Sequence, residues 1–341
     1  MMRYRDAGVD IARADAVKDD IGRAVQSTWT PAVRRLPGGF AGIMRWPGAG
    51  GAPLLAATMD GVGTKLHVGL AAGRAGDAAA DLVYHGANDL LAHGARPLAF
   101  LDYVAQARLD AAVLRDIVSG LARASREVGA VLIGGETAEM PDTYLEGVVD
   151  VAGCMIGAVA EGAVVDGAAV RAGDVVLGLA SAGLHTNGFS LARRVVAASG
   201  LALDDALPGA TGSVGDALLA PHRWYGRAVL PLAEAGRLKA IAHVTGGGIA
   251  GNLVRVLPAG VRAMIDPRAW RTPPLFRWLC EAGGVPLDDA RRVFNMGVGL
   301  ALVCERGEAE AAHAALAAAG ETVYRIGAVE AGERGVVWDD R

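Results

Sequence analysis

The chain has 341 residues, a formal net charge of −4 and 52% hydrophobic residues. Because this length exceeds what one hydrophobic core usually serves, two domains are expected, and the slight negative charge argues against a general nucleic-acid or membrane surface. Three cysteines lie far apart, in no metal or redox spacing, and no signal peptide or long apolar span is evident, which favours a cytoplasmic location.

The N-terminal segment predicts a helix that extends to about Gln26, followed by a glycine-rich loop at 36–42. Two interpretations of this loop stay open. It is either a mobile flap over a ligand or an irregular terminus, and the residues alone favour the second.

The central motif of the first half is residues 54–65, an apolar run that ends in Asp-Gly-Val-Gly-Thr-Lys. The run predicts a buried strand. Asp60 offers hard oxygen to Mg²⁺, glycine permits close approach of backbone N–H groups to phosphate, and Lys65 adds a point charge. The spacing is not that of a Walker A loop, and a plain polar turn after the strand is the alternative.

Residues 76–94 predict a helix that is mostly apolar on one side and carries Asp81, Asn88 and Asp89. Such a polar face is usually only solvated, but Asn88 and Asp89 interrupt an apolar stretch, which favours a ligand role. A strand at 97–104 and an amphipathic helix at 110–128 are expected next.

A short strand at 130–133 is expected to open into a loop at 134–141, Gly-Gly-Glu-Thr-Ala-Glu-Met-Pro. Two carboxylates three residues apart suit a metal–phosphate site, whereas the alternative is a helix start with acids in its first turn. With a further strand at 149–159, this half predicts a mixed α/β domain.

Residues 161–173 are rich in Gly and Asp and mark the expected boundary between a domain at 1–165 and one at 170–341. A strand at 174–180 leads through a small-polar loop into a helix at 189–198, the arrangement that binds phosphate at a helix N-terminus. The alternative is an ordinary N-cap by Thr186 or Asn187.

The rest of the second half predicts a helix around 221–225 that carries Arg223, then a strand from Ile241 into Thr-Gly-Gly-Gly and a helix at 249–256. His243 at that strand end is a candidate for acid–base chemistry or phosphate binding, although a lone histidine is more often structural. A strand at 300–304, a helix from about 308 to 319 and a strand at 323–329 complete the domain.

Taken together, these motifs resemble phosphoribosylformylglycinamidine cyclo-ligase, also called aminoimidazole ribonucleotide (AIR) synthetase. The resemblance covers essentially the whole chain. Its strings, in order, are Tyr-Arg-Asp-Ala-Gly-Val-Asp-Ile (4–11), Asp-Gly-Val-Gly-Thr-Lys-Leu (60–66), Asn-Asp-Leu-Leu (88–91), Phe-Leu-Asp-Tyr (100–103), Gly-Gly-Glu-Thr-Ala-Glu-Met-Pro (134–141), Gly-Leu-His-Thr-Asn-Gly-Phe-Ser-Leu (183–191), His-Val-Thr-Gly-Gly-Gly (243–248), Arg-Val-Leu-Pro (255–258) and Phe-Asn-Met-Gly-Val-Gly (294–299).

The resemblance implies two mixed α/β domains, with a homodimer built through the N-terminal sheets and with ATP and Mg²⁺ bound by the N-terminal domain. It implies an ATP-dependent ring closure of formylglycinamidine ribonucleotide to AIR in purine biosynthesis. The formyl oxygen becomes an iminophosphate, the amidine nitrogen attacks, and phosphate leaves. Phosphoryl transfer needs mainly positioning and charge neutralisation, and ring closure gains from a bound near-attack geometry.

Matched position by position, the resemblance also implies roles for individual residues. The expected Mg²⁺ ligands are Asp60, Asp89 and Glu136, with Asp81 a weaker candidate. His243 is expected to transfer a proton or stabilise charge, with Asp60, Asp89 and Lys65 as the other catalytic residues. The expected ATP-binding residues are Gly61, Gly63, Thr64, Lys65, Asn88, Gly134, Gly135 and Thr137, and the expected substrate-binding residues are Ser181, Gly183, His185, Thr186, Asn187, Arg223, Thr245 and Gly246.

The chain departs from the family pattern at several positions. Met59 stands where a small residue such as Thr is usual, and Arg96 reverses the charge of a usual Glu. Residues 84–87 and 221–226 also differ from the usual strings. Near Ile21 the usual lysine is replaced by Gly-Arg, so that Lys18 or Arg23 matches it only weakly.

Two other classes of function stay open. Selenophosphate synthetase, thiamine-monophosphate kinase and a hydrogenase-maturation dehydratase share the implied architecture, but the first needs a reactive Cys or selenocysteine in its N-terminal loop, and no Cys precedes Cys154. A diverged or non-catalytic nucleotide-binding paralogue is the other alternative, and it predicts ATP binding without ADP formation.

Overall fold

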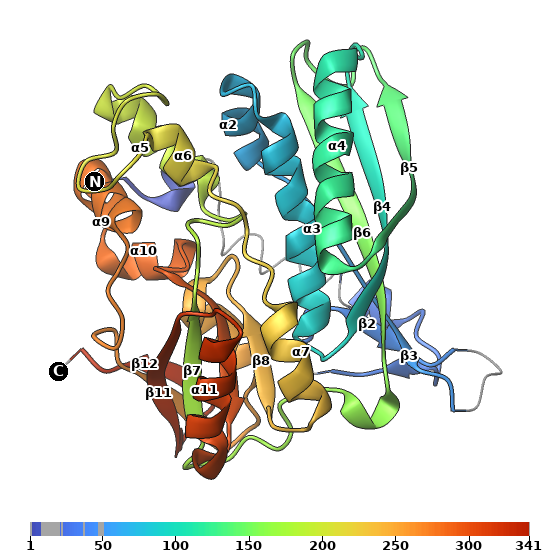
Figure 1. The fold of residues 1–341 in the computed structure, drawn as a ribbon, viewed down its shortest axis with the longest axis vertical. Coiled ribbons are helices and arrows are strands. Elements are labelled where there is room, and N and C mark those ends of the chain that lie inside the picture. Colours follow the sequence, from blue (N-terminus) through green and yellow to red (C-terminus); the bar gives the residue numbers. More distant parts are fainter. Residues whose placement is uncertain (1, 8–20, 22, 37, 47–50, 341) are drawn as a thin grey trace.

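The computed structural model describes residues 2–7, 21, 23–36, 38–46 and 51–340. Its strands form two six-stranded sheets, one in each half of the chain (Figure 1). This arrangement confirms the predicted class of two mixed α/β units. Among the described residues, no helix is long and apolar enough to cross a membrane.

The first sheet has the strand order β1-β2-β3-β6-β4-β5. Its neighbouring strands are antiparallel except for β4 and β5, which run parallel. The strands are β1 (Val33–Arg34), β2 (Gly42–Met44), β3 (Leu54–Gly61), β4 (Arg96–Gln106), β5 (Val131–Glu139) and β6 (Val149–Val159).

Helices α2 (Lys65–Ala71), α3 (Ala75–Leu91) and α4 (Ala111–Val128) belong to this half. Helix α3 is buried along almost its whole length, because it lies between the first sheet and the second half of the chain (Figure 1). Gly86 permits this close packing, since a Cβ atom there would lie 2.8 Å from the Cβ of Met155 on β6. The sheet therefore fixes the position of every functional group that α3 carries.

Two predicted boundaries in this half are wrong. Strand β3 continues through Asp60 and Gly61, which pair with β6, so the motif begins inside the sheet and not in a turn. Strand β5 continues through the expected loop to Glu139, because residues 134–139 pair in parallel with β4. Pairing with a neighbouring strand overrides the local preference of Gly-Gly for a loop. Most of the predicted N-terminal helix lies outside the described residues. Within its described part, residue 21 and residues 23–26 are helical.

The second sheet has the strand order β12-β9-β11-β7-β10-β8. Among the described strands of this sheet, β12 and β9 alone run parallel. Strands β7 and β10 inside the sheet and edge strand β8 are almost completely buried, which explains their continuous apolar runs. The strands are β7 (Val175–Ala180), β8 (Ala240–His243), β9 (Val261–Ile265), β10 (Val298–Cys304), β11 (Val323–Ala331) and β12 (Gly335–Trp338).

The helix expected around 221–225 does not form, because α7 begins only at Gly226 and the preceding residues form an irregular segment. The helices of this half are α5 (Phe189–Ser199), α6 (Val214–Leu218), α7 (Gly226–Glu234), α8 (Gly248–Leu253), α9 (Pro274–Gly283), α10 (Leu287–Val293) and α11 (Ala309–Ala318). Short 3-10 turns lie at Tyr4–Ala7, Glu161–Ala163, Val254–Val256 and Arg306–Glu308.

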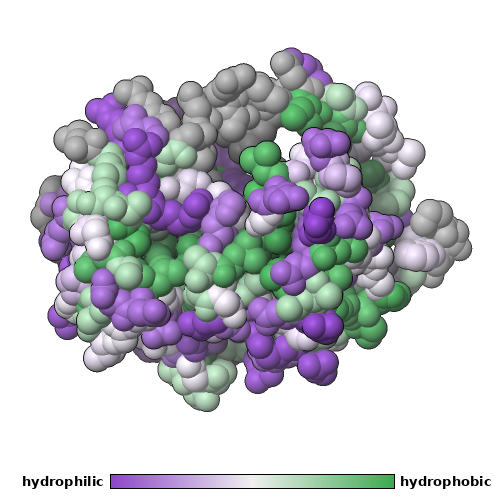
Figure 2. Space-filling view, turned by 90° about the horizontal axis from the view of Figure 1, so that it is seen from above, coloured by the Kyte–Doolittle hydropathy of each residue, from purple (hydrophilic) through white to green (hydrophobic). Residues whose placement is uncertain are grey.

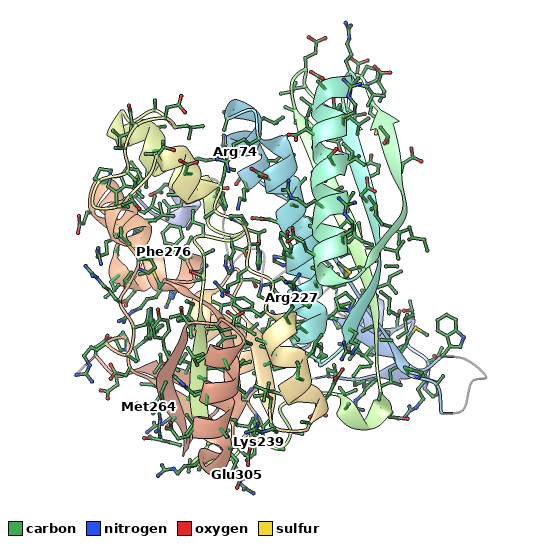
Figure 3. The ribbon with its side chains drawn as sticks, viewed as in Figure 1. Arg74, Arg227, Lys239, Met264, Phe276 and Glu305 are labelled. Atoms are coloured by element: carbon green, nitrogen blue, oxygen red, sulfur yellow. The ribbon has the colours of Figure 1, made fainter. Side chains whose placement is uncertain are left out.

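The two halves share hydrophobic contacts and ion pairs. One continuous apolar cluster joins α3 and the first sheet to α5, α9 and α10. Arg74, at the start of α3, pairs with Asp77 of the same helix and with Asp216 of α6, at 2.9 and 3.0 Å (Figure 3). The residues between the halves are therefore held in a defined arrangement.

Candidate active site

Three family-matched residues converge where the ends of β3, α3 and β8 meet. The imidazole of His85 links two of the carboxylates, since its Nε2 lies 3.0 Å from Asp60 Oδ2 and 3.7 Å from Asp89 Oδ2. On the other side of Asp89, its Oδ1 lies 2.8 Å from His243 Nδ1. Asp60, Asp89 and His243, distant in the sequence, thus form one polar centre.

The charges of this centre are coupled through His85. Burial lowers the pKa of His85, but the nearby carboxylates of Asp89 and Asp60 outweigh it, so that its pKa is raised overall. Burial conversely raises the pKa of Asp60, and the hydrogen bond and charge of His85 outweigh it, so that the pKa of Asp60 is lowered. Asp60 is half exposed and lies at the mouth of the centre, where a ligand can reach it.

His243 is completely buried, and its position defines its chemistry. Because the carboxylate of Asp89 accepts a hydrogen bond from Nδ1, the lone pair of the neutral ring lies on Nε2. That atom lies 3.1 Å from Nε2 of His222. Burial lowers the pKa of His243 despite Asp89, which favours the neutral ring. The lone pair on Nε2 is the site at which such a ring would take up a proton.

The loop at 181–188 closes one side of the centre. His185 adopts a left-handed backbone, with φ of 61°, and its buried ring stacks on His222 at a centroid distance of 4.1 Å. Such a conformation is uncommon outside glycine and clusters at functional sites. The hydroxyl of Thr186 lies 2.6 Å from His85 Nδ1, so this loop contacts the centre directly. Asn187 accepts a long 3.5 Å hydrogen bond from Thr186.

Two asparagines hold the remaining candidate loops in place. Asn295 accepts a hydrogen bond from Ser181 at 3.0 Å and donates one to the carbonyl of Gly183 at 2.8 Å. Asn252 accepts one from Thr245 at 3.2 Å and donates to the carbonyl of Gly246 at 3.2 Å. The side chains of Ser181 and Thr245 are thus already engaged within the protein.

Lys65, expected to bind ATP phosphates, occupies a different environment. Its ammonium group is fully buried, pairs with the equally buried Asp81 and donates to the carbonyls of His185 at 3.0 Å and Ala220 at 3.2 Å. Asp81 also accepts a hydrogen bond from the backbone of His222 at 2.8 Å. We therefore assign to Lys65 and Asp81 a structural role that links the two halves.

Asn88 and Arg223 are also turned away from the centre. The buried amide of Asn88 donates to the carbonyl of Arg223 at 2.9 Å and accepts from the backbone of Tyr225 at 3.3 Å. The guanidinium of Arg223 pairs with Glu321 at 2.7 Å. Both side chains fasten segment 221–225 to its neighbours, because this irregular segment has few backbone hydrogen bonds of its own.

The candidates on β5 lie apart from the centre within one chain. Gly134, Gly135, Glu136 and Thr137 are exposed on this edge strand. Asp60 and Gly135 occupy equivalent rows of the sheet, with β6 and β4 between them. Three strand spacings correspond to roughly 14 Å, too far for Glu136 to share one ion with Asp60.

The motif at residues 60–65 runs from the end of β3 into a turn before α2. Gly63 has φ of +66°, and a Cβ atom there would meet no atom within 4 Å. The amide of Gly61 donates to Asp60 Oδ1 at 2.7 Å, and the hydroxyl of Thr64 lies 3.1 Å from that of Ser190 on α5. This turn is therefore open at Gly63 and anchored at its end.

The described part of the glycine-rich loop, residues 38–42, is fastened to the second half. The guanidinium of Arg255 donates to the carbonyls of Gly38 at 2.9 Å and Gly39 at 2.7 Å, and lies 3.9 Å from the ring centroid of Phe40. The backbone N–H of Phe40 donates to Nε2 of His93 at 2.9 Å. In this structure the loop is a bound strap near Thr58, which contacts the carbonyl of Phe40.

Sequence reasoning missed two members of the centre, His85 and His222. Both lie within the stretches that depart from the family pattern, so the departures themselves were the signal.

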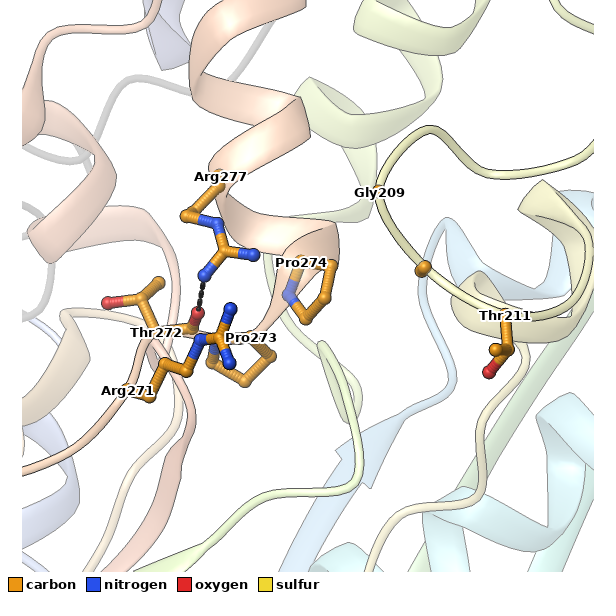
Figure 4. Close-up of a pocket in the computed structure, with 8 residues that line it drawn as sticks. Gly209, Thr211, Arg271, Thr272, Pro273, Pro274 and Arg277 are labelled. Atoms are coloured by element: carbon orange, nitrogen blue, oxygen red, sulfur yellow. Dashed lines mark hydrogen bonds between the residues drawn. The ribbon is translucent and has the colours of Figure 1, made fainter.

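A cavity of about 630 Å³ lies between the loop at 209–211 and residues 271–277, where Arg271 and Arg277 face it (Figure 4). None of the predicted site residues lines this cavity.

Comparisons with known proteins agree with the two-part architecture. The N-terminal domain family of AIR synthase related proteins matches residues 38–159, and the corresponding C-terminal domain family matches residues 171–340. A protein of Sorangium cellulosum named phosphoribosylformylglycinamidine cyclo-ligase is 45% identical over 96% of this chain and 94% of its own. A protein of the same name from Burkholderia multivorans is 43% identical over 98% of this chain and 95% of its own.

Solved structures share the fold at lower identity. Hydrogenase maturation protein HypE in complex with ATP has a TM-score of 0.63 and 24% identity, covering 87% of this chain and 84% of its own. Thiamine-monophosphate kinase from Stenotrophomonas maltophilia has a TM-score of 0.60 and 18% identity, covering 93% and 94%.

Proposed function

We propose a function from one premise, namely that the chain belongs to the AIR synthase related protein family. It is an ATP-dependent cyclo-ligase that converts formylglycinamidine ribonucleotide to 5-aminoimidazole ribonucleotide, with release of ADP and phosphate, in purine biosynthesis. Relatives that carry this name are 43–45% identical over nearly the whole chain. The kinase and maturation-protein alternatives share the fold at much lower identity and are not favoured.

The observation that carries the proposal is the convergence of Asp60, Asp89 and His243 at the junction of the two halves. Phosphoryl transfer from ATP to the formyl oxygen requires phosphate charge to be neutralised and the reactants to be positioned. The amidine nitrogen then bonds to the activated carbon, phosphate leaves with the former formyl oxygen, and the ring nitrogen loses a proton. A carboxylate pair can hold the cation that neutralises phosphate charge, and a neutral histidine beside it can take up the released proton.

We propose that Asp60 and Asp89 hold Mg²⁺. Their Oδ2 atoms flank the same nitrogen of His85, and hard carboxylate oxygens suit this ion, which normally keeps water and phosphate oxygens as its other ligands. The exposed backbone at Gly61 and Gly63, around the end of β3, is the proposed place for the ATP phosphates. Bound there, the cation would neutralise phosphate charge during transfer. Glu136 could join only from the second copy of a dimer.

We propose His243 as the group that accepts the proton released at ring closure, with Asp89 fixing its tautomer. Residues 181–187 and the turn at Thr245–Gly246 would surround the substrate. His243 is covered in this structure, so substrate binding has to open access to its Nε2 through the adjacent loops. A His243→Gln enzyme that retained full turnover would contradict this role.

A homodimer through the first sheet is also proposed. The face of that sheet opposite α3 and α4 bears exposed apolar side chains, among them Met59, Leu101, Val131 and Ile133. A hollow of about 360 Å³ beside it is lined mostly by apolar residues such as Trp46 and Leu98. Contiguous apolar surface of this kind commonly marks an interface. Seen from above, other hydrophobic residues gather in a band across the middle of the molecule (Figure 2), and this view does not look onto the outer face of the first sheet.

A cytoplasmic location is proposed from the three cysteines, all of which are free thiols in the structure. Burial raises the pKa of Cys304 to about 11, which makes this thiol unreactive. Free cysteines without a disulfide framework are typical of a reducing compartment.

The test is to measure ADP and AIR in the same reaction, using purified protein with ATP and Mg²⁺, with and without formylglycinamidine ribonucleotide. Equal amounts of ADP and AIR are expected only with the substrate. Asp60→Asn should abolish both, whereas Asp204→Asn, at an exposed position outside the site, should not. ATP binding without substrate-dependent ADP would refute the assignment and identify a non-catalytic paralogue.

A further inference from the structure

Three buried histidines from three separate elements meet beside the carboxylate centre. His85 lies on α3, His222 lies in the segment before α7, and His243 ends β8. One ring nitrogen from each lies within 4.8 Å of the others. We propose that these imidazoles form a binding site for a divalent transition-metal cation of the zinc class, which joins the two halves of the chain.

The separation of the ring nitrogens suits such a cation. A zinc–nitrogen distance of about 2.0–2.1 Å in a tetrahedral site corresponds to a nitrogen–nitrogen distance of roughly 3.3 Å. The Nε2 atoms of His222 and His243 are 3.1 Å apart and face each other. His85 contacts the same pair, since its ring centroid lies 4.9 Å from that of His243 and 5.6 Å from that of His222. Because the three nitrogens lie within 4.8 Å of one another, the proposal requires the rings to shift toward a common ion.

Two buried ring nitrogens without hydrogen-bond partners in the described part of the chain border the cluster. Nδ1 of His222 and Nδ1 of the stacked His185 are buried without a hydrogen-bond partner among the described residues. The side chains of both residues are at least nine-tenths buried. A buried nitrogen without a partner is costly, and it persists in proteins mainly where a ligand, ion or water occupies the site.

The surroundings already supply the supporting contacts that metal sites use. A metal-binding histidine usually donates its other ring N–H to a carboxylate or another acceptor, which orients the ring. His243 does so to Asp89 at 2.8 Å, and His85 Nδ1 lies 2.6 Å from the hydroxyl of Thr186. Asp60, 3.0 Å from His85 Nε2, is an oxygen donor available for a further position.

The donor set distinguishes this site from the proposed Mg²⁺ site. Three imidazole nitrogens select zinc, cobalt, nickel or copper, whereas Mg²⁺ prefers oxygen. Two of the three histidines lie in the stretches 84–87 and 221–226, where the chain departs from the cyclo-ligase pattern. The histidine cluster is therefore a feature of this chain, although it shares His243 and the adjacent carboxylates of Asp60 and Asp89 with the residues on which the proposed function depends.

The experiment uses full-length, untagged protein that has been treated with a chelator and then titrated with Co²⁺ or Zn²⁺. We expect one Co²⁺ per chain, with the visible absorption band of a tetrahedral or five-coordinate cobalt site, and displacement of Co²⁺ by equimolar Zn²⁺. His222→Thr, which removes one of the three imidazoles, should lose the band. His67→Ala, at an exposed position on α2, is the matched control and should retain it.

A second measurement keeps the test informative if a variant folds poorly. Zn²⁺ should raise the thermal unfolding midpoint of the wild-type protein, because a ligand that binds only the folded state stabilises it. Asp89→Asn, which keeps all three histidines, should weaken Zn²⁺ binding by roughly 10–100-fold. These readouts need neither ATP nor substrate, so they are independent of the proposed activity.

Three results would overturn the inference. The first is wild-type protein that binds no Co²⁺, and the second is a cobalt spectrum that His222→Thr leaves unchanged. The third is a Zn²⁺-induced rise in the unfolding midpoint that is equal in the wild type and in a folded His222→Thr variant. Any of these would mean that the cluster is only a packed hydrogen-bonded group, or that the metal binds elsewhere.

Discussion

The buried pair of Lys65 and Asp81 allows a sharp test of whether this lysine is structural or binds phosphate. Both side chains are almost completely inaccessible, and the ammonium group also donates to two backbone carbonyls. Lys65→Met keeps the length of the apolar stem and removes the charge. It leaves the Asp81 carboxylate buried without its partner.

The magnitude follows from this environment. Removing one partner of a buried ion pair typically costs about 3–5 kcal/mol of folding free energy. The Coulomb attraction of two charges about 4 Å apart, at an effective dielectric constant of about 20, is about 4 kcal/mol, which agrees. We therefore expect Lys65→Met to lower the free energy of unfolding by about 3–5 kcal/mol.

Urea denaturation followed by circular dichroism measures this loss. The double variant Lys65→Met/Asp81→Asn should recover roughly half of it or more, because the neutral amide can still accept the hydrogen bond from the backbone of His222. Arg171→Met removes an exposed ion pair with Glu305 and should cost no more than about 1 kcal/mol. Unchanged stability of Lys65→Met, together with a large loss of ATP affinity, would refute the structural role.

Three further predictions concern the strap, its histidine and the sheet surface. Burial lowers the pKa of His93 below its ordinary value of 6.5, so its stabilising contribution is complete above that pH and is lost as the pH falls through it. The thermal unfolding midpoint should therefore decrease as the pH is lowered from about 7.5 to about 5.5, and it should decrease less in His93→Gln. An equal decrease in the two proteins would contradict this. Arg255→Ala should speed amide hydrogen exchange of residues 38–42 roughly tenfold or more, since it removes two charge-assisted hydrogen bonds; unchanged exchange would show that other contacts hold the strap. Ile133→Glu should convert the proposed dimer to a folded monomer in sedimentation velocity, and a persistent dimer would place the interface elsewhere.

The sequence alone was sufficient to predict the class of fold, whereas the ligand chemistry of the first motif stays a prediction. Alternating and continuous apolar runs reveal burial directly, which is why most of the central strands and helix α4 were located within a few residues. Asp110 illustrates this, since its side chain accepts from the amides of Ala112 and Val113 and begins α4 one residue beyond the predicted start. Apolar periodicity and helix caps depend on residues that are close in the sequence, so the sequence alone reveals them.

Tertiary structure decided which of the candidate polar residues face one another. Lys65 and Asp60 are five residues apart, yet one is fully buried in an ion pair and the other is half exposed, because β3 ends and α2 turns inward between them. His85 and His222 are 137 positions apart in a chain of 341 residues, so no spacing rule could pair them. Only the packing of α3 against both halves brings their rings together, because α3 is covered by the first sheet on one side and by the second half on the other.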